Sequence, residues 1–330
     1  MGSLDILAAN LLSPIVLAFA LGILARLVKS DLEFPDGLYQ ALAIYLLLAI
    51  GLKGGVALSV TPVAAFLGPA LATLALGVVT PLTSYAVLRR PLGFDRVNAA
   101  ALSAHYGSVS AVTFIAALQV AELTGRTAEG YMPALVALLE VPAIIVALML
   151  AYMRGVAGKA AEADEPRAGS WQAALHEVLS GRSVVLLLGG LVIGLLAGEE
   201  GFAKVEPFFV GGFQGALVLF LLEMGLVTAR RLGDLRTVGV RLIGFGIVAP
   251  IVHGLLGVWL GGVAGLSPSG AAVLGAMVAS ASYIAAPAAV RIALPEASPT
   301  LYLTAALAIT FPFNLTLGIP LFFAAADWLA

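Results

Sequence analysis

Two polar stretches interrupt an otherwise apolar chain, and both carry side chains that can bind an ion. Residues 103–113 read Ser-Ala-His-Tyr-Gly-Ser-Val-Ser-Ala-Val-Thr, and residues 280–287 read Ser-Ala-Ser-Tyr-Ile-Ala-Ala-Pro. Hydroxyl groups can donate hydrogen bonds to an anion or offer oxygen ligands to a hard cation such as Na⁺. Pro287 has no amide hydrogen and therefore weakens a helix around it. Both stretches predict irregular backbone next to a small-ion site.

Ionisable side chains within apolar segments form a second set of candidates, because burying them in a membrane is costly. Glu140 and Glu223 could each hold a cation or carry a proton, or could instead join two helices by an ion pair or a hydrogen bond. For Glu223, and for Lys53 towards the outer end of the second span, we favour the structural interpretation. His105 and His253 are expected to be hydrogen-bonded packing residues. The chain has no cysteine and only three histidines, which excludes a thiolate site and argues against a zinc site.

The elements that must position these residues are membrane-spanning helices. Of the 330 residues 61% are hydrophobic and 11% are charged, whereas about 25% are charged in a soluble domain; the mean hydropathy is +1.06. A net charge of −2 gives no basic field for nucleic acid. One span needs about 20 apolar residues, so the intervals between charges predict an all-α membrane protein of ten spans. We place them at 11–28, 38–57, 64–88, 97–123, 132–152, 183–197, 209–228, 238–261, 269–294 and 300–325.

The distribution of basic residues predicts the orientation of the chain in the plasma membrane. With the N-terminus outside, fourteen of the 17 lysines and arginines fall in inner loops, as the positive-inside rule requires. An even number of spans places the C-terminus outside as well. The inner segment 153–182 contains a polar linker at 160–167 and a short amphipathic helix at 171–179. This segment could be a tether between two halves or a docking surface for a cytosolic partner.

The halves 1–152 and 183–330 repeat the same signals in the same order, at an offset of roughly 170 residues. Five spans in each half make the second half enter the membrane from the opposite side, and such an inverted repeat is typical of secondary transporters. The matched segments are Gly51-Leu52 with Gly225-Leu226, Gly77–Pro81 with Gly246–Pro250, and Glu140–Pro142 with Thr310–Pro312.

The two polar stretches fall at corresponding places in the fourth and ninth spans, with Ser108 opposite Tyr283. If both helices are broken and cross there, the N-terminal ends of two half-helices point at one place near the middle of the membrane. Unpaired amide groups and positive dipole ends at that place suit a small anion. The alternative is that small residues only allow the helices to pack closely.

At these residues the chain resembles the sodium-dependent bicarbonate transporter family, over nearly its whole length. The resemblance is carried by Ile50–Gly55, Gly107–Ser110, Ala249–Gly254, Leu294–Pro299 and Gly318–Phe322. Two residues depart from the cyanobacterial pattern: Tyr283 stands in place of an aspartate and Lys53 in place of a threonine. We therefore expect a non-cyanobacterial member, whose substrate could be bicarbonate, another small monocarboxylate or an oxyanion.

The resemblance implies a mobile core of spans 3–5 and 8–10 and a gate of spans 1, 2, 6 and 7, assembled as a homotrimer. It also implies bicarbonate uptake by an elevator-type mechanism, Na⁺ as the coupling ion without other cofactors, and control by a PII-like cytosolic protein. By motif, the substrate contacts would be Gly107, Ser108, Ser110, Ala111, Thr113, Ile284, Ala285 and Ala286, and the cation candidates are Glu140, Ser282 and Asn314.

Three other functions compete with this interpretation. A cation/proton antiporter would use Glu140 or Glu223 as its proton carrier. An intramembrane serine hydrolase would pair Ser110 with His105 or His253 within hydrogen-bond reach, but Ser110 lacks the flanking glycines of the Gly-x-Ser-x-Gly pattern. A purely structural or receptor role would leave the inverted repeat without a purpose. The sequence therefore predicts a transporter and not an enzyme.

Overall fold

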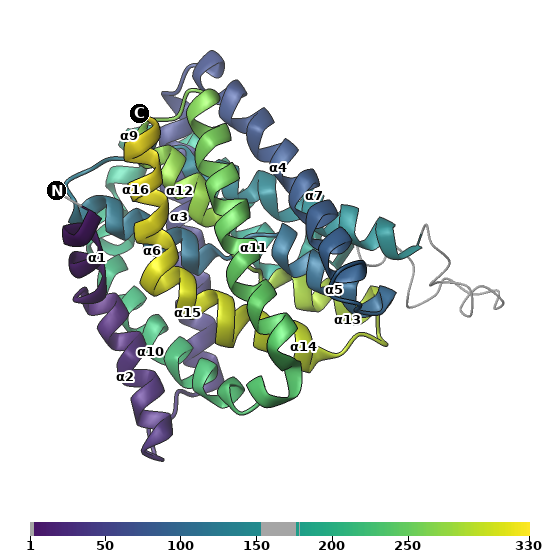
Figure 1. The fold of residues 1–330 in the computed structure, drawn as a ribbon. Helices are drawn as coiled ribbons and strands as arrows, with labels where there is room; N and C mark the ends of the chain where they lie inside the picture. The colour runs from purple at the N-terminus through teal and green to yellow at the C-terminus, as the bar shows by residue number, and fades with distance from the viewer. Residues whose placement is uncertain (1–2, 153–175, 178) are drawn as a thin grey trace.

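The computed structural model describes residues 3–152, 176–177 and 179–330, and their regular structure is helical (Figure 1). The expected linker at 160–167 and most of the amphipathic helix at 171–179 lie outside these residues. The helices are α1 (Ser3–Leu11), α2 (Pro14–Leu27), α3 (Asp36–Ser59), α4 (Val63–Arg89), α5 (Arg96–Gly107), α6 (Ala111–Leu123), α7 (Met132–Tyr152), α9 (Arg182–Ala203), η2 (Pro207–Gly211), α10 (Phe213–Leu232), α11 (Leu235–Val263), α12 (Pro268–Val278), α13 (Ala285–Ala293), α14 (Pro299–Thr304), η3 (Ala305–Thr310), α15 (Phe311–Phe313), η4 (Asn314–Gly318) and α16 (Ile319–Leu329).

Eight helical segments of the described chain are long and apolar enough to cross a membrane, and α2 and α12 are shorter apolar helices. The expected first span begins later than residue 11, because Ser13 caps α2 by accepting a hydrogen bond from the Val16 amide and Pro14 occupies the first turn. Its 14 residues rise about 21 Å, less than the roughly 30 Å hydrocarbon core. The expected span 269–294 consists of two helices, α12 and α13.

Two helix pairs cross at glycines, and each crossing brings backbone against backbone. A Cβ atom on Gly22 of α2 would lie 2.1 Å from the Leu222 carbonyl oxygen, and one on Gly225 of α10 would lie 2.9 Å from the Gly22 Cα. Likewise α3 meets α9 where a Cβ on Gly51 would lie 2.9 Å from the Gly190 Cα. Only glycine allows such an approach, which is how membrane helices gain close packing.

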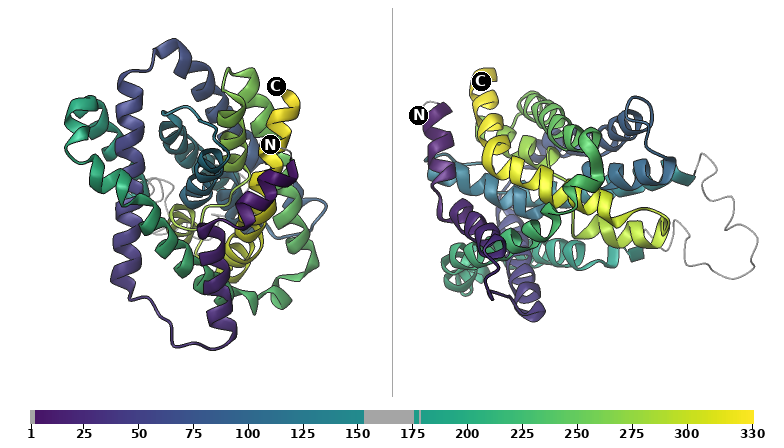
Figure 2. Two further views of the ribbon diagram at one scale, coloured as in Figure 1. Left: turned by 90° about the vertical axis from the view of Figure 1, so that its left-hand side faces the viewer. Right: turned by 60° about the horizontal axis from the view of Figure 1, so that its bottom comes forward.

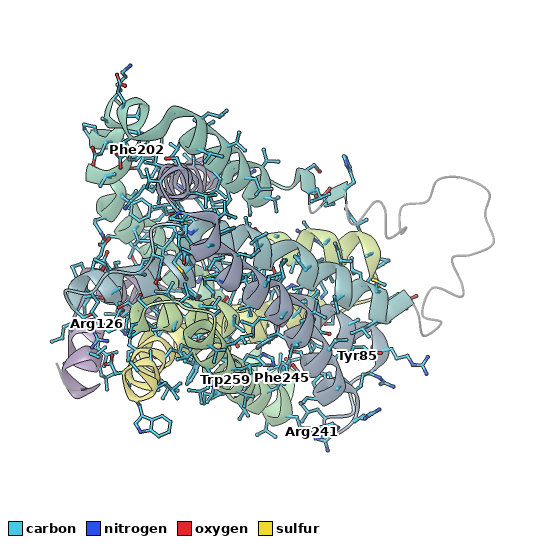
Figure 3. The ribbon with its side chains drawn as sticks, turned by 90° about the horizontal axis from the view of Figure 1, so that it is seen from above. Tyr85, Arg126, Phe202, Arg241, Phe245 and Trp259 are labelled. Carbon is cyan, nitrogen blue, oxygen red and sulfur yellow. The ribbon has the colours of Figure 1, made fainter. Side chains whose placement is uncertain are left out.

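Contacts between segments far apart in the chain lie at the two ends of the bundle. At one end, the Asn98 side chain accepts a hydrogen bond from the Ser298 amide at 2.8 Å. At the other end, the Arg126 guanidinium forms an ion pair with Asp327 at 2.5 Å. Figure 3 shows Arg126 and Arg241 at opposite ends of the helices.

The two chain termini lie at the Arg126 end. They lie side by side in Figures 1 and 2, and α1 packs against α16 and η4. The Asn10 side chain donates a hydrogen bond to the Leu315 carbonyl at 2.8 Å, which attaches the first helix to the last span. A chain that crosses the membrane an even number of times has both termini on the same side, and the structure agrees with this.

Candidate functional site

The first polar stretch forms an interruption between α5 and α6. Gly107 ends α5 against Pro81 of α4, and a Cβ on this glycine would lie 2.8 Å from the proline ring. Ser108 has extended backbone, with φ −83° and ψ 177°. Ser110 then caps α6, because its hydroxyl oxygen accepts a hydrogen bond from the Thr113 amide at 3.2 Å. A close glycine contact followed by a serine cap explains why the helix stops and restarts here.

The second interruption separates α12 from α13 over residues 279–284. The Asn314 side chain donates a hydrogen bond to the Ala279 carbonyl at 2.8 Å, and the Ser282 hydroxyl accepts one from the Ala286 amide at 3.3 Å. Pro287 follows in the first turn of α13, where its missing amide hydrogen does not matter. Side chains therefore satisfy backbone groups that the membrane interior could not.

The two interruptions are joined directly to each other. The Ser110 amide donates a hydrogen bond to the Ser280 hydroxyl at 2.7 Å. The Ser282 amide donates one to the His105 carbonyl at 2.8 Å. In agreement with these bonds, α6 packs against α12 and α5 packs against α13. Segments about 170 residues apart in the chain thus form one structural unit.

A small cavity lies between this unit and two neighbouring helices, α3 and α9. Its volume is about 10 Å³, which is roughly the space that one water molecule needs. Glu140 of α7 supplies the carboxyl group in the lining, and this residue is only 5% exposed. Ser110 and Ser282 supply hydroxyls from the two interruptions. The full lining is Leu47, Val109, Ser110, Ala111, Val136, Glu140, Ser183, Leu187, Ser282, Tyr283 and Ile284.

The chemistry of this lining suits a small ion in a largely apolar wall. The Ser110 oxygen is occupied by the Thr113 amide, so its hydrogen can be donated toward an anion. The Tyr283 hydroxyl approaches the Ser110 side chain without reaching hydrogen-bond geometry. It is therefore a further hydroxyl that an ion could recruit. The carboxyl group of Glu140 can hold a cation or a proton.

Comparison with protein families gives an independent result. The model of the Na⁺-dependent bicarbonate transporter superfamily matches residues 14–327. The chain belongs to this superfamily. A comparison with curated proteins gives no match. The match covers both interruptions and Glu140, so the resemblance stated from the motifs is confirmed, and membership identifies a membrane transporter family.

In this superfamily member, the cavity brings together five of the residues predicted from the sequence. Their positions follow from the interruptions and from the face that α7 turns toward them. Predicted residues outside the lining have other contacts: Gly107 packs on Pro81, and Asn314 bonds to Ala279. The five in the cavity are Ser110, Ala111, Ile284, Glu140 and Ser282, and the six outside it are Gly107, Ser108, Thr113, Ala285, Ala286 and Asn314.

Two of the outer residues still have unsatisfied polar atoms. The Ser108 hydroxyl and the Asn314 side-chain oxygen are buried and have no hydrogen-bond partner in the described chain. Sequence reasoning missed Ser183 and Leu187 of α9, which also line the cavity. The first turn of an apolar helix far along the chain gives no signal that it borders this site.

The histidines lie in packing positions, as predicted. The His105 ring bonds to the Ala101 carbonyl at 2.7 Å and stacks on Tyr302 with ring centroids 4.4 Å apart. The His253 ring bonds to the Thr83 hydroxyl at 2.9 Å. Neither ring lines the cavity with Ser110, and the hydrogen bonds described for the two rings go to Ala101 and Thr83 instead.

Two other ionisable candidates lie away from the cavity. Lys53 is exposed and lines a separate groove with Glu122 and Arg126 at the Arg126 end of the bundle. Glu223 is buried on α10 and does not line the cavity. Glu140 is therefore the intramembrane carboxylate that the fold places at the site.

Proposed function

We propose that this transporter carries bicarbonate, or a closely similar small anion, together with Na⁺ through the cavity between the two interruptions. The observation that carries the proposal is the composition of that cavity. Hydroxyls from both interruptions and one buried carboxyl group converge on this space. In the described conformation it holds about one water molecule, so it has to widen to admit the anion with Na⁺. The superfamily supplies the substrate class and the Na⁺ dependence.

The anion would be held at the start of α6. Ser110 caps this 13-residue helix, and its hydroxyl hydrogen is available because its oxygen already accepts the Thr113 amide. The helix start adds a positive partial charge. A hydrogen bond to a charged group contributes about 1.5–3 kcal/mol, so one such donor can decide whether a weakly held anion binds.

The cation would be held by Glu140 and by neutral oxygens such as that of Ser282. Na⁺ accepts carboxylate, hydroxyl and carbonyl oxygens as ligands. With a single carboxylate in the lining, a bound anion would supply additional negative charge. Binding of Na⁺ and of anion would then be cooperative, and each would raise the affinity of the other by the same factor.

The packing supports an inverted repeat that permits alternating access. The repeat relates the first span to the sixth and the second to the seventh, so a contact of α2 with α10 corresponds to one of α9 with α3. The structure contains both contacts, at Gly22–Gly225 and at Gly190–Gly51. We propose that these four helices form the gate and that the helices bearing the interruptions move against them as an elevator.

Other parts of the prediction stay open to direct test. Both termini outside, the homotrimer and a PII-like regulator are expectations from charge distribution and family resemblance. Reporter fusions test the orientation: an alkaline-phosphatase fusion active at residue 165 would contradict it. Mass measurement of the purified protein tests the trimer.

A cation/proton antiporter is the second candidate, and the position of Glu140 in the cavity favours it. Uptake of radiolabelled bicarbonate into proteoliposomes separates the two functions. Uptake that requires an inward Na⁺ gradient supports the proposal. Bicarbonate flux that does not depend on Na⁺ and is driven by a pH gradient would overturn Na⁺ coupling. Na⁺ flux driven by a pH gradient without bicarbonate would favour the antiporter.

A further inference from the structure

A second, larger pocket adjoins the cavity on the side away from Arg126. This vestibule has a volume of about 360 Å³, which is enough for a small anion with several waters. It shares Ser183 and Ile284 with the cavity, so the two spaces are neighbours. Its lining is Glu177, Ser180, Gly181, Arg182, Ser183, Val184, Ile284, Ala285 and Ala288.

At the Arg126 end, hydrogen bonds between α10 and α6 lie along a separate groove. Gln214 of α10 donates hydrogen bonds to Gln119 and, at 3.3 Å, to Glu122, both on α6. The groove at that end shares no lining residue with the cavity. The described conformation therefore places the cavity next to the vestibule and apart from the other groove.

Ser183 is the residue that connects the two spaces. It lies in the first turn of α9, it is 6% exposed, and it lines both the cavity and the vestibule. Within the described chain its hydroxyl makes no hydrogen bond. The Ser183 oxygen is not one of the fully buried polar atoms without a partner, so it is open to the spaces it lines, and a ligand passing between them could accept its hydrogen.

The charges around Ser183 favour a negative ligand on the α9 side. Gly181 precedes α9 and has no side chain to cap it, so the first amide groups of the helix stay available. Arg182 adds a full positive charge where the helix dipole is already positive. One group opposes this: the Glu177 carboxylate also lines the vestibule, and it forms no ion pair with Arg182 in the described residues.

From these observations we infer that the vestibule is a second anion site, in which Arg182 and Ser183 receive a small oxyanion as it leaves the cavity. The identity of the anion rests on the proposed function. The preference of the vestibule for negative over positive ligands does not. Arg182 and Glu177 set that preference in opposite directions. The vestibule would hold the anion beside Arg182 before release.

The absence of native cysteine allows a clean test with the detergent-solubilised full chain. A Ser183→Cys variant is modified with an anionic and with a cationic methanethiosulfonate reagent, and the ratio of the two rates is measured. We expect the anionic reagent to react faster. Adding Arg182→Gln should lower the ratio about fivefold or more, because one unit charge a few ångströms away changes a local concentration by about that factor even in water. Adding Glu177→Gln should raise the ratio.

Two controls make the result specific. Ser59→Cys, at an exposed position on α3 outside both spaces, should show no change of ratio with Arg182→Gln. Ala288 lines the same vestibule, so Ala288→Cys can serve as the probe if Ser183→Cys fails to fold. If Arg182→Gln does not change the ratio of the anionic to the cationic modification rate at Ser183→Cys, the proposed anion site is wrong.

Bicarbonate itself provides the link to transport. At about ten times its dissociation constant it should slow modification of Ser183→Cys about tenfold. Normal bicarbonate uptake without such protection would overturn the assignment of bicarbonate to the vestibule. A different result would overturn the proposed function instead: the wild-type chain takes up no bicarbonate, yet the ratio of modification rates still depends on Arg182. The vestibule would then be an anion site for another oxyanion.

Discussion

Replacement of Ser110 by alanine separates the helix-capping role that the structure shows for its hydroxyl from the anion-binding role that we propose. Its oxygen caps α6 through the Thr113 amide at 3.2 Å, and because the residue lines the cavity, its rotatable hydrogen can be donated to an anion there. Loss of an N-cap costs about 1 kcal/mol of stability. Loss of a hydrogen bond to a charged ligand costs about 1.5–3 kcal/mol, which weakens anion binding by a factor of roughly 10 to 150. The Ser110 amide bond to Ser280 involves backbone and is retained in the variant.

The chain offers matched controls for each role. Ser13→Ala removes an equivalent cap, because the Ser13 hydroxyl accepts the Val16 amide at 3.3 Å on α2, away from the cavity. It should lower the melting temperature by a similar amount and leave anion affinity unchanged. Ser110→Thr keeps the hydroxyl and the cap, so it should retain more affinity than Ser110→Ala despite its extra methyl group.

Calorimetric titration of bicarbonate in the presence of Na⁺, with thermal unfolding of the same samples, measures both quantities. We expect Ser110→Ala to lose stability like Ser13→Ala and, in addition, at least tenfold in affinity. If Ser110→Ala and Ser13→Ala lose equal stability and neither loses affinity, Ser110 is a helix cap and not an anion ligand, and the reasoning from its free hydrogen is wrong.

Three further predictions concern other parts of the molecule. Glu140→Gln should reduce the amount by which Na⁺ raises bicarbonate affinity without unfolding the protein, and titrations in Na⁺ and in a large organic cation would detect an unchanged Na⁺ effect that refutes this role. Gly270→Ala should destabilise the protein by about 1–3 kcal/mol, because its Cβ would lie 1.8 Å from a Glu129 carboxylate oxygen; Glu129→Ala should make the second substitution nearly neutral, and additive losses of melting temperature would contradict the contact. Partial burial raises the pKa of Asp95, but hydrogen bonds from the Asn98 amide and side chain outweigh it and hold this pKa below its ordinary value. The stabilisation from the Asp95 carboxylate is therefore complete at neutral pH and disappears as the pH falls through the lowered pKa, so the difference in melting temperature between wild type and Asp95→Ala should shrink below about pH 4; a constant difference would refute it.

Much of the helical layout follows from local sequence. The span predicted at 132–152 coincides with α7 (Met132–Tyr152), and the one predicted at 238–261 lies within α11 (Leu235–Val263). Pro142 and Pro250 lie inside these helices without ending them, whereas Arg154 follows α7 in the sequence and a Gly-Leu-Ser-Pro turn at 265–268 follows α11. Such boundary signals act over a few residues. The caps at Ser13 and Ser110 are local as well, since each bonds an amide three residues ahead. Boundaries of this kind can be predicted without knowledge of the packing.

Pairing of the two polar stretches was also predictable, because their matching places in the two halves implied a common location. Hydrogen bonds now join them at Ser110–Ser280 and His105–Ser282. The sequence could not predict which hydroxyls face the cavity. Ser110 and Ser282 line it, whereas Ser108 is buried outside the lining without a partner.

The sequence by itself determined the membrane class, the approximate position of most spans and the superfamily, because hydropathy, charge and motifs are local properties of the chain. Tertiary structure alone decided that Glu140 faces the cavity while Glu223 and Lys53 do not, and that Ser183 enters the site from α9. The physical reason is that these helices are apolar on nearly every side. In a soluble helix, the spacing of polar and apolar residues shows which face is buried. In a membrane helix, the face toward lipid and the face toward neighbouring helices are both apolar, so the sequence does not distinguish them. Its rotation is set by close packing, as at Gly51 and Gly190, and that packing exists only once both helices are in place.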